Sequence, residues 1–258
     1  SNAGSRRGVL DSRGTLFWET LRFVKELRPK VLVFENVRGL LSMKNVDGSL
    51  LIESIEQELR DVGYTPAHKL INMAHFGVPQ NRYRVVIVAI RSDVSTEGFD
   101  FTLIETAPAK TIGEMLSIPV SGEDPNDIHW PLSPQAVALL PFIPEGGSWK
   151  SVPYENLPDR LKRIRDDMKR YHSPNFFRRF GRDEVVGTMT ASATPENSGI
   201  IHPTESRRFT VREVARFQSF PDTYIFHGST QSQYKQIGNA VPPEFGRRLA
   251  SALSESYF

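Results

Sequence analysis

The sequence contains no cysteine, and this absence excludes several kinds of chemistry at once. Without a thiol the chain forms no disulfide, offers no thiolate to zinc and supplies no sulfur nucleophile of its own. It also has no run of eighteen apolar residues, which excludes a membrane-spanning helix. Its six histidines are scattered without metal-ligand spacing, so we expect no metal site. The formal net charge of +2 is too small to indicate a nucleic-acid partner.

The composition is that of an ordinary globular protein. Hydrophobic residues make up 39% and charged residues 24% of the 258 residues, enough for one large domain or two small ones. Residues 1–3, Ser-Asn-Ala, are typical of a vector-derived scar and are left out of the fold argument.

The first ninety residues alternate between helix and strand. Apolar spacing predicts helices over 15–27 and 48–62. The apolar run 31–34 predicts a strand buried on both faces of a parallel sheet, and further strands are expected over 68–73 and 83–90. The pattern indicates an α/β fold, the second half of a doubly wound sheet.

The chain then becomes proline-rich. Half of the eighteen prolines fall between residues 93 and 160, without a long helical or alternating pattern. We therefore expect a second domain over 93–205 that is small, loop-rich and mostly β. Order returns with a capping box at 210–213, and Pro242-Pro243 opens a last helix. We expect 206–258 to return to the first domain, which covers 4–92.

Two motifs in the first domain indicate chemistry. Glu35 and Asn36 follow a buried strand, where open α/β sheets bind their ligands. An apolar strand tip would favour a protonated carboxyl at Glu35, although Glu35 capping a turn is an equal alternative. Arg82 and Arg84 have the same parity, which predicts two guanidiniums on one strand face. They suit a phosphate or a carbonyl oxygen, or they keep an edge strand soluble.

Two further segments are ambiguous when taken alone. The turn around Gly238 and Asn239 permits a close backbone approach and unusual dihedral angles, as in many helix–turn–helix joints. The stretch 160–182 holds nine lysines and arginines and few acidic residues. Such a stretch is more often a solvated helix face than a phosphate-binding track.

Together these segments resemble the C5-cytosine-specific DNA methyltransferase family, in the family's order. Residues 29–40 are similar to its Glu-Asn-Val block and 80–84 to its Gln-x-Arg-x-Arg block. Residues 210–222 are similar to the penultimate block and 236–243 to the last. Residues 6–17 resemble the sequence that follows the family's catalytic loop.

The resemblance implies a Rossmann-like methyltransferase domain and a role for each motif. A thiolate adds to C6 of a flipped cytosine, and electrons move towards N3 and O2. Glu35 would then supply a proton or hydrogen bonds at N3 and the exocyclic amine, and Arg84 would hold O2. Asn36 would shape the turn, and Arg82 would support the catalytic loop or a phosphate. The donor S-adenosyl-L-methionine would meet Asn239 and the backbone of Ala240 and Val241.

By the same resemblance, residues 93–205 are expected to form a target-recognition domain for duplex DNA. The resemblance makes five residues of this domain candidates for groove or phosphate contacts. They are His172, Asn175, Arg178, Arg179 and Thr188.

The family's glycine-rich cofactor loop and its Pro-Cys-Gln loop would precede Arg6, and neither occurs in this sequence. We therefore expect the chain to be inactive alone, as a fragment or as one half of a complementing pair in a cytoplasmic restriction–modification system. Loss of the leading strands would expose the edge of 31–34 and favour pairing with another copy. Two alternatives stay open, a non-catalytic sequence-specific DNA-binding module and an RNA-directed enzyme of the family.

Overall fold

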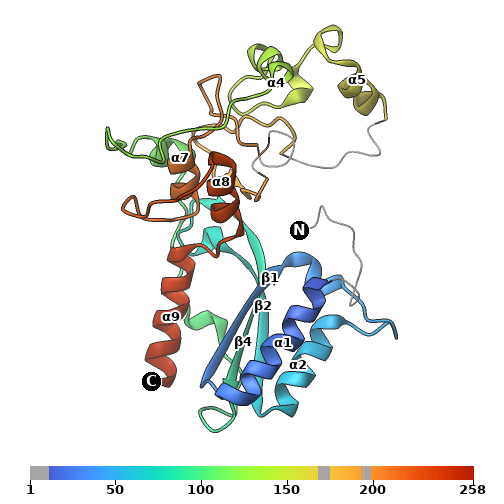
Figure 1. Ribbon diagram of the computed structural model, residues 1–258, viewed down its shortest axis with the longest axis vertical. Helices are drawn as coiled ribbons and strands as arrows, with labels where there is room; N and C mark the ends of the chain where they lie inside the picture. The colour runs from blue at the N-terminus through green and yellow to red at the C-terminus, as the bar shows by residue number, and fades with distance from the viewer. Residues whose placement is uncertain (1–11, 168–174, 193, 195–198) are drawn as a thin grey trace. The chain divides into compact units, whose positions relative to one another are not determined.

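The computed structural model describes residues 12–167, 175–192, 194 and 199–258 (Figure 1). The chain forms two compact units, and each is described by itself. Unit 1 comprises Ser1–Asn72, Tyr83–Glu105 and Arg248–Phe258, whereas unit 2 comprises Met73–Arg82 and Thr106–Arg247. These divisions differ from the expected boundaries after residues 92 and 205. Unit 1 continues to Glu105, residues 73–82 belong to unit 2, and only the last eleven residues return to unit 1.

Unit 1 is built on a three-stranded antiparallel sheet in the order β1 (Val31–Val37), β4 (Tyr83–Arg91), β2 (Tyr64–Asn72). The central strand is β4, and its residues 85–90 are at most 2% exposed. In the described part of the chain β1 pairs with β4 alone, and Val33 of β1 is 48% exposed. The expectation of a parallel strand buried on both faces was therefore wrong for 31–34. The short apolar run belongs to an edge strand, and the longer run of β4 occupies the centre.

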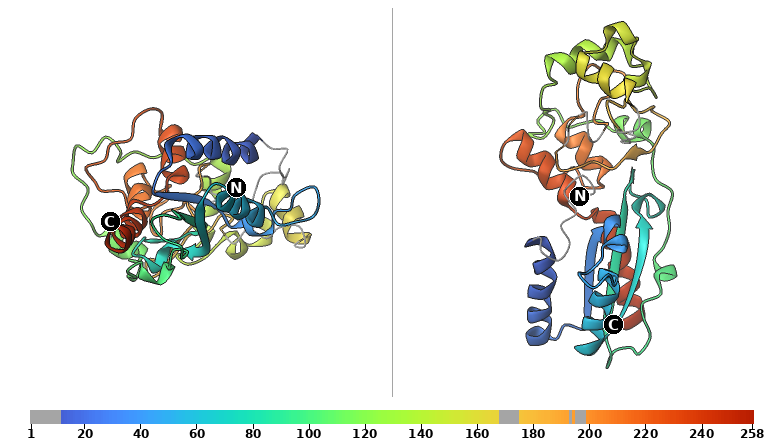
Figure 2. Two further views of the ribbon diagram at one scale, coloured as in Figure 1. Left: turned by 90° about the horizontal axis from the view of Figure 1, so that it is seen from below. Right: turned by 90° about the vertical axis from the view of Figure 1, so that its right-hand side faces the viewer.

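Helices α1 (Ser12–Leu27) and α2 (Leu51–Asp61) contribute to the core of unit 1. Leu21 of α1 and Leu59 of α2 join a cluster with Val85 and Ile87 of β4. The expected helices 15–27 and 48–62 are confirmed, with starts shifted by about three residues. Gly63, at a φ of +85°, follows the end of α2. Figure 2 shows α2 and the C-terminal turns of α9 (Pro243–Tyr257) on opposite sides of the sheet.

In the described part of unit 2 the regular secondary structure is mainly helical, and most residues lie in turns and loops. Its helices are α3 (Ile112–Leu116), α4 (Pro134–Leu139), α5 (Asp159–Asp166), α7 (Val211–Phe217), α8 (Thr230–Asn239) and the first turn of α9. Its strands, β3 (Gln80–Asn81) and β5 (Val186–Gly187), form one parallel pair. Short 3-10 turns in the two units span Arg38–Ser42, Met73–His75, Phe101–Leu103, Leu140–Phe142, Trp149–Ser151 and Tyr154–Asn156.

The expectation of a mostly β second domain was wrong for these residues. Ser133 caps α4 directly before Pro134, and Thr111 forms a capping box with Glu114 at the start of α3. Prolines and small polar residues in this region were expected to form turns between strands. Several of them instead start short helices. A strand of only two residues, β5, ends at Gly187.

Two apolar clusters support unit 2. One gathers side chains of α3, α7 and α8, among them Phe217 and Ile237, around Phe209, which precedes α7. The other surrounds Trp149 and Phe176 with side chains of α4 and α5. The predicted capping box at the start of α7 is confirmed, because Thr210 and Glu213 each bond the other's backbone N–H.

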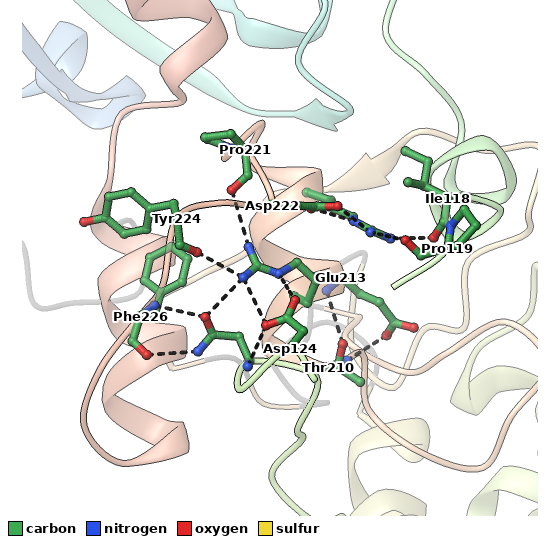
Figure 3. Close-up of polar contacts among 12 residues, drawn as sticks. Ile118, Pro119, Asp124, Thr210, Glu213, Pro221, Asp222, Tyr224 and Phe226 are labelled. Carbon is green, nitrogen blue, oxygen red and sulfur yellow. Dashed lines mark hydrogen bonds and ion pairs between the residues drawn. The ribbon is translucent and has the colours of Figure 1, made fainter. Parts of the chain in front are cut away.

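Two buried arginines of α7 hold the segment 118–126 against the rest of unit 2 (Figure 3). Arg212 is fully buried and pairs with Asp124, and it donates to the Tyr224 carbonyl at 3.0 Å. Arg216 pairs with Asp222 at 2.6 Å and donates to the Ile118 carbonyl at 2.7 Å. The proline-rich segment is thus held by buried guanidiniums rather than by a strand ladder.

Candidate active site

The side chains of Glu35 and Arg84 lie together in unit 1. In the β1–β4 ladder Arg84 stands opposite Val37, so Glu35 is its diagonal neighbour on the same face. The Arg84 Nε and the Glu35 Oε1 are 2.6 Å apart. Both side chains are largely buried, 14% exposed for Arg84 and 23% for Glu35. The strand register therefore brings a carboxylate and a guanidinium into one partly open position.

The electrostatics of this pair differ from the apolar surroundings expected for Glu35. Burial lowers the pKa of the Arg84 guanidinium, and the nearby Glu35 charge acts in the opposite direction. Arg84 also donates from Nη1 to the Tyr83 carbonyl at 2.8 Å. The Glu35 carboxyl thus meets a fixed cation, which orients it.

Asn36 lies beside this pair and is exposed. Its Oδ1 accepts from the Val37 N–H at 2.8 Å, a local bond that shapes the chain where β1 ends. This contact is of the kind expected for a residue that forms the turn after the strand.

Arg82 does not share a strand face with Arg84. It falls between β3 and β4, so the prediction that both guanidiniums lie on one strand face was wrong for Arg82. Arg82 is 2% exposed, which leaves no surface for a phosphate. Its guanidinium donates to the carbonyls of Gly238 at 3.0 Å, Ala240 at 3.2 Å and Met189 at 3.3 Å.

Two buried glutamines that the sequence did not single out accompany Arg82. Gln80 donates to the Gln218 Oε1 at 2.7 Å, and its own Oε1 accepts from the Met189 N–H at 3.2 Å. Gln218 donates to the Ala240 carbonyl at 2.7 Å. Both side chains are fully buried. Each glutamine lies inside a motif that resembles a family block, 80–84 for Gln80 and 210–222 for Gln218. The motifs alone do not show that the two side chains bond each other.

The segment 239–241 is the end of α8 and the turn after it. Asn239 is the last helical residue and takes no positive φ, contrary to the unusual dihedral angles considered for it. Gly238 permits the expected close approach, because a Cβ there would lie 2.6 Å from the Ala191 nitrogen. Asn239 and Val241 are exposed.

The candidate DNA contacts differ in availability. Arg178 pairs with Glu184 and lies 4.8 Å from the centre of the Phe180 ring. Arg179 is 9% exposed, so its burial gives no support to a phosphate contact. The Thr188 hydroxyl donates to the Asn81 carbonyl at 2.7 Å.

Two other candidates complete this set. The Asn175 side chain lies against Gly187, because a Cβ on that glycine would come within 2.8 Å of it. His172 lies outside the described residues.

Comparison with known proteins identifies the family. The sequence model of the C-5 cytosine-specific DNA methylase family matches residues 1–255. The chain belongs to this family. The type II methyltransferase M.Eco47II of Escherichia coli is 35% identical over 94% of this chain and 58% of its own length. M.NgoFVII of Neisseria gonorrhoeae is 37% identical over 95% of this chain and 64% of its own length. The chain thus spans about 60% of the length of these relatives.

Solved structures agree at the level of the fold. The Dnmt2 methyltransferase of S. pombe has a TM-score of 0.57 and 18% identity, covering 100% of this chain and 76% of that chain. The methyltransferase EhMeth of Entamoeba histolytica has a TM-score of 0.58 and 17% identity, covering 96% of this chain and 70% of that chain. Both are methyltransferases, and the chain shares their α/β fold.

Two features are absent from the described residues. No helix among them is long and apolar enough to cross a bilayer. The same residues contain no group of three or more histidines and acidic residues arranged to hold a metal ion.

Proposed function

We propose that this chain carries the base-binding and DNA-recognition parts of a DNA (cytosine-5)-methyltransferase of the restriction–modification type. The observation that supports it most directly is the Glu35–Arg84 pair. A carboxyl group and a guanidinium side by side present acceptors and donors to one edge of a pyrimidine. Glu35 faces N3 and the exocyclic amine of a flipped cytosine, and Arg84 faces O2. Charge that develops on N3 and O2 is stabilised by these two groups.

The methyl donor in this proposal is S-adenosylmethionine. When bound, it supplies the methyl group as an electrophile. Asn239 holds it through its amide, and the backbone of Ala240 and Val241 adds contacts from the turn after α8. These residues are suited to the task because Asn239 and Val241 are exposed while the helix end beneath them is fixed.

A cysteine from outside this sequence is required, because the sequence contains none. We assign that cysteine to a complementing polypeptide portion that joins unit 1 at the edge of β1. In the described part of the chain β1 pairs with β4 alone, so its other edge is available for a further strand. Val33 at 48%, Phe23 at 53% and Leu27 at 73% exposure supply apolar side chains in unit 1 for such an interface.

Recognition of duplex DNA belongs to unit 2 in this proposal. Arg160 and Arg163 of the basic helix α5 are exposed and face solvent rather than the core. Together with Arg178, Asn175 and Thr188 they are the candidates for phosphate and groove contacts.

The deciding experiment supplies the family's Pro-Cys-Gln portion in trans and measures tritium transfer from S-adenosylmethionine to DNA and, separately, to tRNA. Transfer to DNA is expected, with Glu35→Gln and Arg84→Lys each lowering it by about 100-fold or more. Arg91→Lys is the matched control, since Arg91 pairs with Asp93 at the far end of the same strand. The proposal fails if a folded complex methylates neither substrate, or if Glu35→Gln retains full transfer. Transfer to tRNA alone would indicate an RNA-directed enzyme.

A further inference from the structure

The C-terminal end of helix α8 is held by a side chain from a distant part of the chain. The last carbonyls of any helix lack partners within the helix and carry partial negative charge. Arg82 donates to the Gly238 and Ala240 carbonyls at 3.0 and 3.2 Å. A buried guanidinium at this position caps the helix and is favoured by its dipole. Arg82 therefore stabilises the end of α8 although 156 residues separate it from Gly238.

The two glutamines extend this contact to another segment. Gln218 donates to the same Ala240 carbonyl at 2.7 Å, and Gln80 donates to Gln218 at 2.7 Å. Met189 is bound through both backbone groups, since its N–H donates to Gln80 and its carbonyl accepts from Arg82. One buried network thus joins the turn after α8 to the segment that follows β5.

Peptide geometry turns this network into a constraint on the exposed turn. A trans peptide directs its carbonyl and its N–H to opposite sides. Because Arg82 and Gln218 hold the Ala240 carbonyl from inside, the Val241 N–H is directed away from them. Val241 is 41% exposed, and the carbonyl below it accepts from two donors.

Close packing leaves little freedom for adjustment. A Cβ at Gly238 would lie 2.6 Å from both the Thr190 carbonyl carbon and the Ala191 nitrogen. The backbone after β5 therefore lies directly against α8, and a displacement of one segment moves the other.

From these contacts we propose that Arg82, with Gln80 and Gln218, is a positioning residue that sets the conformation of the turn 239–241 and ties it to residues 188–191. It acts through backbone carbonyls and touches neither the base nor a phosphate. The link to the methyl donor rests on the proposed function, in which 239–241 contacts S-adenosylmethionine and 188 lies in the recognition region. The network then makes donor binding sensitive to the segment that leads away from that region.

The test compares Arg82→Lys and Gln218→Leu with Arg212→Lys in the full chain. Lysine keeps the charge but cannot donate in three directions with a planar fork. Arg212 is the matched control, because it is an equally buried arginine of unit 2 that bonds Asp124 and carbonyls elsewhere. Amide hydrogen exchange is followed in peptides that cover 186–192 and 236–245, with overall stability measured by urea unfolding. Affinity for S-adenosylmethionine is then measured with the complementing portion present.

Exchange in both peptides is expected to rise about tenfold or more in Arg82→Lys and Gln218→Leu, the effect of leaving a buried carbonyl without one of its donors. Arg212→Lys should leave both peptides unchanged at comparable loss of stability. Unchanged exchange in the first two variants, or an equal rise in the control, overturns the positioning role. Faster exchange without weaker donor binding would leave the positioning role intact and refute the assignment of 239–241 to the donor.

Discussion

Replacing Arg212 with methionine provides a severe test of how unit 2 is held together. Arg212 is fully buried, and its partner Asp124 is also buried, with 8% of its side chain exposed. The guanidinium also donates to the Asn126 Oδ1 at 3.3 Å and to the Tyr224 carbonyl at 3.0 Å. Methionine fills much of the volume but removes the charged donor from the Asp124 carboxylate and from these acceptors.

The expected loss of stability is about 3–5 kcal/mol, the cost of leaving one charge of a buried pair uncompensated. Unit 2 has roughly 150 residues, for which each kcal/mol lowers the Tm by about 2–4 °C. Arg212→Met should therefore lower the Tm of unit 2 by roughly 6–20 °C. Combining it with Asp124→Asn removes the uncompensated charge, so the double variant should cost about 1–3 kcal/mol less than the two single variants added together.

The pH dependence of this pair has a defined sign. Burial alone would raise the pKa of the Asp124 carboxyl, but hydrogen bonds from Arg212 and from the Asn126 N–H hold that pKa below its ordinary value. A carboxyl whose pKa is lowered by folding contributes stability above its unfolded value, and the contribution is lost as the pH falls further. The pair should therefore stabilise unit 2 above about pH 4 and lose this effect in stronger acid.

Urea and thermal unfolding monitored by tryptophan fluorescence will measure these effects, because Trp149 is buried in a core of unit 2. The reasoning is refuted if Arg212→Met unfolds within about 1 kcal/mol of the parent chain, or if the cost of the double variant equals the sum of the singles. Either result would mean that Asp124 reaches water when its partner is removed.

Three further predictions address other parts of the molecule. Burial, and then the positive charge of Arg207, lower the pKa of His202. The unfolded chain therefore takes up this proton first, and stability should fall as the pH drops below about 6.5. His202→Asn should flatten the dependence of the urea midpoint on pH between 7.5 and 5.5. Gly238→Ala should lower the free energy of unfolding in urea by about 1–3 kcal/mol, because the added Cβ meets the backbone of 190–191. Gly246→Ala, with nothing within 4 Å of the added Cβ, should stabilise α9 by about 0.5–1 kcal/mol. Similar effects at both glycines would contradict the close approach at Gly238. Val33→Lys should weaken association of the complementing portion by about tenfold without lowering the Tm, and an unchanged affinity would place the interface elsewhere than the edge of β1.

Local signals in this sequence predict local structure well. The capping box of Thr210 and Glu213 starts α7, Gly63 ends α2, and Pro243 opens α9 with Phe245 and Leu249 buried on one stripe. Each signal acts between residues at most four positions apart, where the backbone geometry of a helix fixes which groups meet.

Structural features that depend on residues far apart in the sequence could not be predicted from local patterns. The apolar run 31–34 is compatible with a central or an edge strand, and what decides between them is the number of neighbouring strands, which the run does not contain. The prolines of 93–160 are compatible with turns between strands or with helix starts, because the same φ serves both. The contacts of Gln80 and Arg82 cross more than one hundred residues and have no periodicity to reveal them.

The block Gln-x-Arg-x-Arg shows what a motif can and cannot convey. Its alternate spacing predicts a common face only if one strand runs through both arginines, and the ladder of β4 begins at Tyr83, after Arg82. Arg84 is therefore positioned by strand register against a carboxylate, whereas Arg82 is positioned by the helix end that needs a cation. Two residues of one type, two positions apart, thus meet different chemical needs. The one directed at Glu35 suits contact with a reacting base, and the one directed at carbonyls suits holding the structure that such contact requires.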